Sequence, residues 1–169
     1  MPSQARGISK AGASAHSRKS NKVSSCGVKR AWLELFDWEF VTATNAALCQ
    51  PRKALHKPTS GGHDRTRRLW EKNHRREMFL DEAADLCREC HRLAPFCNFN
   101  GNTFAAIARS LVDTLKLKAD EAHVIRSLLG HVVAGTASNV ETKELRQFSR
   151  SLTAEQWKMV GARRAAPRP

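Results

Sequence analysis

The stretch FLDEAADLCRECHRLA, residues 79–94, decides the fold class because its apolar residues recur with the period of an α-helix. The apolar positions are separated by three or four residues and are Phe79, Ala83, Leu86, Cys87, Cys90, Leu93 and Ala94. This spacing places one apolar stripe along a helix, and such a stripe is stable only when another element covers it. Pro95, which cannot continue a helix, follows directly. We therefore predict a core helix that ends before Pro95.

Two further helices are predicted upstream of this stretch. Residues 28–50 carry large aromatic residues at helical spacing with acids between them, and Pro51 stops that pattern. Asp64 is a suitable cap for a second helix, which either continues into residues 79–94 or restarts at Asp81. The helix over residues 28–50 is both acidic and aromatic, which is typical of interface helices. We expect it either to complete the core or to pack on a neighbouring subunit.

Three more helices are predicted after Pro95, because residues 104–115, 120–133 and 140–152 each carry an apolar face at helical spacing. The first of these helices is predicted to start at a cap at Asn102 or Thr103, and the second to start at Asp120 and end at Gly135. The capping-box pair Ser138 and Glu141 opens the third, and a second such pair follows at Thr153 and Gln156. No stretch alternates with period two over a useful length. We therefore predict an all-α fold, a compact bundle of about five or six short helices.

Basic residues are concentrated in three segments. Residues 1–30, 51–76 and 161–169 hold 19 of the 29 Lys and Arg residues and only 2 of the 16 acids. Residues 77–160 hold 10 basic residues against 11 acids. A near-neutral body with basic appendages is typical of a protein that holds a polyanion by its phosphates. The alternative is a soluble domain whose basic tails only keep it in solution.

Composition divides the chain into five segments. Residues 1–27 consist mainly of Ser, Ala, Gly, Lys and Arg, with almost nothing to bury, so we expect them to be a disordered basic arm. The full division is a basic arm over 1–27, an acidic and aromatic helix over 28–50, a basic loop over 51–63, a helical domain over 64–160 and a basic tail over 161–169.

The predicted phosphate contacts come from these basic segments. They are Arg6, Lys10, Arg18, Lys19 and Lys22 in the arm, Arg52 and Lys53 in the loop, and Arg65, Arg67, Arg68, Lys72, Arg75 and Arg76 in the helix that follows. Residues 65, 68, 72, 75 and 76 share one face of a continuous helix over about 16 Å. Trp70 lies among these bases and either stacks on nucleic-acid bases or belongs to the core.

These features predict a non-enzymatic nucleic-acid-binding protein, such as a nucleocapsid or coat protein or a component of a ribonucleoprotein particle. We expect it to form a homo-oligomer or to dock on a larger particle. RNA is slightly favoured over DNA, because no recognition helix with its turn is evident. No Ser-His-Asp or paired-carboxylate pattern indicates catalysis.

The pattern Cys87-Arg88-Glu89-Cys90-His91, with Cys97 six residues later, allows several chemistries. Cys87 and Cys90 fall on the apolar stripe, so they fit small buried core residues, and no cofactor is then expected. Alternatively, Cys87, Cys90 and Cys97 hold zinc with His91 as fourth ligand, in a zinc-binding regulatory protein. The spacing C-x-x-C-H is also that of c-type haem attachment, which needs export or an organellar ligation system.

Residues 86–92, LCRECHR, preceded by Asn73 and His74, resemble the closing helix of HNH-type nucleases. The resemblance covers about twenty residues and implies a ββα-metal fold, a hydrolytic metal ion and a structural zinc. It makes His74 the candidate for the base that activates water. The pattern lacks the upstream C-x-x-C of that family, and Pro95 and Phe96 stand where a second metal histidine is expected.

The expected location is an intracellular reducing compartment, either cytoplasm or nucleus. The chain has five cysteines, an odd number, and the first residues lack the apolar centre of an export signal. Their Ser, Ala, Lys and Arg content without acids also fits organellar import. No apolar run approaches the roughly 18 residues that a membrane span needs, so we expect no membrane partner.

Overall fold

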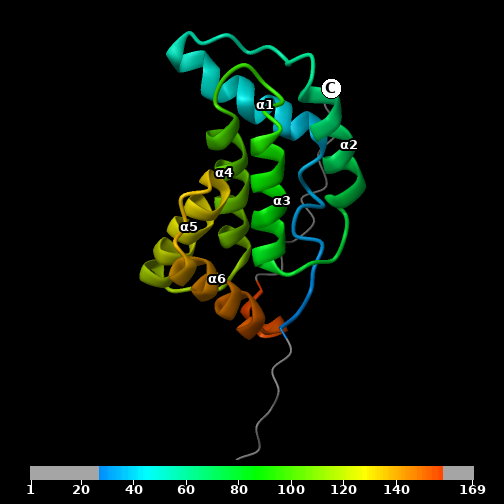
Figure 1. Cartoon of the computed structure of the whole chain (residues 1–169). Coiled ribbons are helices and arrows are strands. Elements are labelled where there is room, and N and C mark those ends of the chain that lie inside the picture. Colours follow the sequence, from blue (N-terminus) through cyan, green and yellow to red (C-terminus); the bar gives the residue numbers. More distant parts are fainter. Residues whose placement is uncertain (1–26, 158–169) are drawn as a thin grey trace, which may run out of the picture.

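The predicted core stripe forms helix α3, Leu80–Arg92, at the centre of the computed structural model, which describes residues 27–157 (Figure 1). Helix α4, Asn100–Ser110, and helix α5, Ala119–Ala134, pack on α3 and on each other. The apolar side chains of these three helices make most of one buried core. Within residues 27–157 the chain has six α-helices and no strand, which confirms the predicted all-α class.

The other three helices surround this centre. Helix α1, Trp38–Cys49, packs on α4 at one end of the bundle, and helix α6, Asn139–Ser151, packs on α3 and α5 at the other end (Figure 1). Helix α2, His63–Asn73, lies on the outside against α1 and α3. Short 3-10 turns occupy Gln50–Arg52, Leu111–Thr114 and Ala154–Gln156. Only one side of α2 is therefore covered by protein.

The predicted helix over residues 28–50 is wrong at its start, because α1 begins only at Trp38. The Asp37 carboxylate accepts a hydrogen bond from the Phe40 N–H at 2.7 Å and caps the helix there. Upstream, the backbone of Arg30 pairs with Met78, and the Trp32 indole donates to the Met78 carbonyl at 3.0 Å. These contacts between distant residues hold the segment before Asp37 in a non-helical path. Trp32 is buried, so this segment completes the core.

The region after Gly62 forms two helices with a break between them, as the restart alternative predicted. Gly62, not Asp64, is the residue before α2. A β-carbon at Gly62 would overlap the carbonyl oxygens of Leu93 and Ala94, so only glycine allows α2 to start this close to the end of α3. At the start of α3 the Phe79 N–H donates to Glu82 Oε2 at 2.9 Å.

Later helix signals were confirmed in part. Gly135 ends α5 in a left-handed conformation, and Ser138 and Glu141 form the predicted capping box of α6. The cap predicted at Asn102 or Thr103 is wrong, because α4 begins at Asn100 with Phe99 as its cap residue. The Asn100 side chain bonds both the N–H and the carbonyl of Phe96 in the preceding loop. The pair Thr153 and Gln156 begins only a 3-10 turn.

Candidate nucleic-acid interface

Helix α2 is attached to the body through Trp70. The Trp70 side chain is fully buried, its indole Nε1 donates to the Phe36 carbonyl at 2.7 Å, and its ring lies 5.9 Å from that of Phe104. Thr66 is buried on the same side of the helix. Trp70 is therefore a core residue and no stacking platform for bases. Its burial also fixes which side of α2 faces outward.

The outward side of α2 carries Arg65, Arg68 and Lys72, and all three are exposed. We call these three residues the α2 ridge. Their spacing of three and four residues puts them on one face, over about 10 Å of helix. Among residues 27–157, no carboxylate forms an ion pair with any of them. The ridge is thus a line of exposed positive charge on a helix that is anchored from its other side.

Arg67 differs from the ridge because it has a partner on its own helix. Its Nε donates to Glu71 Oε1 at 2.8 Å. The hydrogen bond to Glu71, and then the charge of Glu71, raise the pKa of Arg67. Its positive charge is already balanced locally, so a phosphate has to compete with Glu71 for it.

The predicted continuous face of five bases is wrong at its far end, because α2 ends at Asn73 and the chain then turns. Arg75 lines a groove of about 570 Å³ between α1 and α2, together with Arg67. Arg76 lines a groove of about 370 Å³ between α2 and α3. The two arginines are thus separated to opposite sides of α2, and neither extends the ridge.

Both grooves are lined by acids, and all of these acids except Glu71 come from segments outside α2. The acids of the α1–α2 groove are Asp37, Glu39 and Glu71, and those of the α2–α3 groove are Glu82, Asp85 and Glu89. Partial burial, and then the charge of Asp81, raise the pKa of Asp85. Sequence reasoning missed this arrangement, because only the packing of α1 and α3 beside α2 brings the other five acids to it.

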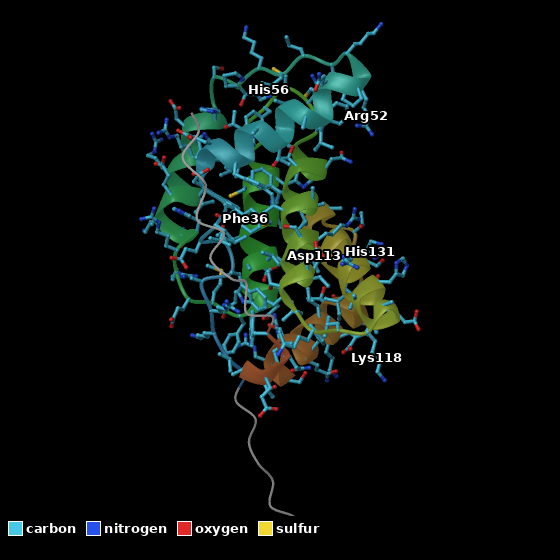
Figure 2. The ribbon with its side chains drawn as sticks, turned by 180° about the vertical axis from the view of Figure 1, so that it is seen from behind. Phe36, Arg52, His56, Asp113, Lys118 and His131 are labelled. Carbon is cyan, nitrogen blue, oxygen red and sulfur yellow. The ribbon has the colours of Figure 1, made fainter. Side chains whose placement is uncertain are left out.

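The other predicted phosphate contacts are not gathered at α2. Arg52 and Lys53 lie at the end of α1 that points away from α2 (Figure 2). The Arg52 guanidinium lies 5.0 Å from the centre of the Phe99 ring, and Lys53 has a left-handed backbone with φ of 50°. The predicted contacts Arg6, Lys10, Arg18, Lys19 and Lys22 lie outside the described residues, as does the predicted tail over 161–169.

The cysteines of α3 lie in the core, as their place on the apolar stripe predicted. Cys87 and Cys90 are fully buried. Burial raises the pKa of the Cys87 thiol to about 12, and burial followed by the charge of Cys87 raises the pKa of Cys90 as well. The thiolate is the form that binds metal, so these surroundings oppose metal ligation.

The other two residues of the predicted zinc set do not join them. Cys97 is exposed in the loop after α3, where its N–H donates to the Lys57 carbonyl at 2.9 Å. The ring of His91 places Nδ1 3.0 Å from the Val133 carbonyl. In the part of the chain that the structure describes, no three His, Cys, Asp or Glu residues form a group that could hold a metal ion.

The resemblance to HNH nucleases does not extend to the fold. Their ββα arrangement needs a hairpin before the closing helix, whereas the segment before α3 contains α2 and a turn. His74 is buried, and its Nδ1 lies 3.2 Å from the Trp70 carbonyl.

Comparisons of the chain with protein-family models, with curated proteins and with solved structures gave no match. Over residues 27–157, no helix combines the length and the apolar character that crossing a membrane requires.

Proposed function

We propose that the protein binds nucleic acid without catalysing a reaction, and that the α2 ridge makes phosphate contacts. The observation that carries the proposal is the exposed line of Arg65, Arg68 and Lys72, which lacks acidic partners within residues 27–157. A phosphate that meets such a base releases a condensed counterion and breaks no existing ion pair. The net charge of +13 favours the same class of partner.

The bases of residues 1–27 and 161–169 are proposed to add contacts of the same kind. They carry no acids beside them in the sequence, so they favour phosphate over any particular base sequence. Assembly into a homo-oligomer or a larger ribonucleoprotein particle belongs to the same proposal. It is supported by the exposed apolar side chains of Leu35 and Phe40, which are 73% and 43% exposed beside the start of α1.

The test replaces the three ridge residues together, as Arg65→Gln, Arg68→Gln and Lys72→Gln in the full chain. The affinity for unrelated oligonucleotide sequences should fall by a similar factor. The slope of log K against log salt concentration should become shallower by about 2, as expected when three contacts to a single strand are lost. Fluorescence anisotropy titrations at several salt concentrations measure both quantities.

A matched variant separates a local effect from one of net charge. Lys116, Lys118 and Lys143 are exposed on the bundle, away from α2, and their replacement by Gln removes the same total charge. We expect this variant to keep its salt slope. An equal loss in both variants would show that net charge alone drives binding. Denaturant unfolding should place the ridge variant within about 1 kcal/mol of the wild type, since exposed charges contribute little to stability.

A further inference from the structure

We infer that the α2 ridge selects a single nucleic-acid strand over a duplex, because rows of acidic side chains border it on both sides. This inference rests on the proposed function and names its substrate class. The ridge itself is one helix wide, which is about 10 to 12 Å including side chains. The two acid-lined grooves lie on either side of it, one between α1 and α2 and the other between α2 and α3.

On the α1 side, the border consists of Asp37, Glu39 and Glu71. All three are exposed, and they outnumber the two arginines that line the same groove. One of these arginines, Arg67, is already bonded to Glu71. This groove therefore presents a net negative charge to anything that extends beyond the ridge towards α1.

On the α3 side, the border consists of Glu82, Asp85 and Glu89, which occur at helical spacing along one face of α3. Arg76 is the one base among the residues that line this groove. Glu82 has structural partners, because it accepts a hydrogen bond from the Phe79 N–H and lies 3.6 Å from the Arg150 guanidinium. Asp85 and Glu89 are the exposed acids of this row that no ion pair engages within residues 27–157.

The dimensions of nucleic acid then decide which form fits. A single strand has one line of phosphates, which lies along the ridge and leaves both grooves uncovered. A duplex has two lines of phosphates, separated by a major groove about 12 Å wide. When one line contacts the ridge, the other lies over an acidic row. When the ridge enters the major groove, both lines lie over acidic rows.

Repulsion between phosphates and these acidic rows weakens duplex binding. No additional attractive contact to the single strand is needed for the protein to prefer it. Like charges that face each other across an interface suppress the wrong partner, which is a common source of specificity. The Debye length is about 10 Å at 0.1 M salt, so the acidic rows repel phosphates that lie directly over them, whereas their effect on phosphates a full ridge width away is largely screened.

The experiment measures the affinity of the full chain for a 20-nucleotide single strand and for a duplex of the same length and sequence, in about 100 mM salt. The wild type should bind the single strand about tenfold more tightly than the duplex. The variant Asp85→Asn with Glu89→Gln should tighten duplex binding about fivefold and change single-strand binding less than twofold. Glu39→Gln tests the other border and should act in the same direction.

The matched control replaces Glu121 and Glu144, two exposed acids of α5 and α6, by Gln. It should change both affinities by the same factor. Equal affinity of the wild type for single strand and duplex would overturn the inference. The inference would also be overturned if the variant Asp85→Asn with Glu89→Gln bound the single strand and the duplex more tightly by the same factor. Thermal unfolding must show that this variant is folded. Failure of the wild type to bind either form would instead overturn the proposed function.

Discussion

Helix α2 and helix α3 lie side by side, yet they contribute to the protein in opposite ways. Of the 11 residues of α2, only Thr66 and Trp70 are buried, whereas α3 buries 7 of its 13 residues. An element with so little buried surface adds stability mainly through its few anchors. The outer face of α2 is therefore free to carry residues that the fold does not need, while nearly every change on the inner face of α3 alters packing.

The use of charge differs in the same way. On the bundle, charged side chains take part in structure: Asp113 pairs with Arg126, and the buried Asp81 lies 3.5 Å from both Arg146 and Arg150. On the ridge of α2, the bases have no such role within residues 27–157. The difference teaches that the same residue types serve the fold in one region and remain available to a partner in the other. Substitutions on α2, on α3 and on α6 test these two contrasts.

The largest effect is expected for Trp70→Ala. This change removes the anchor of α2, together with the hydrogen bond from the indole to the Phe36 carbonyl. It should lower the free energy of unfolding by about 3 to 5 kcal/mol, the usual cost of truncating a buried aromatic side chain. Urea unfolding followed by circular dichroism measures it. A loss below about 1 kcal/mol would mean that contacts other than Trp70 hold α2 on the body.

A smaller effect is expected for Cys87→Ala or Cys90→Ala. Each removes one small buried side chain from α3, so each should cost about 1 kcal/mol. A chelator should leave the melting temperature of the wild type unchanged, because a core thiol has no metal to lose. A full equivalent of bound zinc in the purified protein, lost together with stability on chelation, would establish the zinc alternative, since structural metal binding is coupled to folding.

The periodicity of the sequence predicted both α2 and α3. Periodicity identifies helices well where each local pattern agrees with the final packing, as in residues 79–94. It failed over residues 28–37, where Trp32 and Arg30 bond to Met78, more than forty residues away. A local pattern contains no information about such a partner.

The candidate site, like the fold, could be predicted from the sequence only in part. Composition alone located the basic segment that contains α2. Arg75 and Arg76 do not belong to the ridge, because α2 ends at Asn73. Apart from Glu71, the bordering acids come from residues 37 to 39 and 82 to 89, so their position beside α2 depends on how three helices pack. Long-range packing of this kind is visible only in the folded chain.

The smallest effect is expected for Glu141→Gln, which tests whether charge on the bundle is structural. Hydrogen bonds from the Ser138 backbone, and then from the His131 ring, lower the pKa of Glu141 from 4.5 to about 2. A carboxyl whose pKa is lower in the folded state stabilises the protein fully above its unfolded value, and this contribution disappears as the pH falls through the folded value. The window is therefore pH 4.5 down to about 2.

In that window, the melting temperature of the wild type should decrease more steeply with falling pH than that of Glu141→Gln. The two should converge below the folded pKa of about 2, because protonated Glu141 and glutamine are then both neutral and offer similar hydrogen bonds to the start of α6. Glu144→Gln, an exposed acid of the same helix, should leave the steepness unchanged. Parallel curves for Glu141→Gln and the wild type would show that this carboxylate contributes nothing to the cap. The contrast between structural charge on the bundle and available charge on α2 would then rest on the pairs of Asp81 and Asp113 alone.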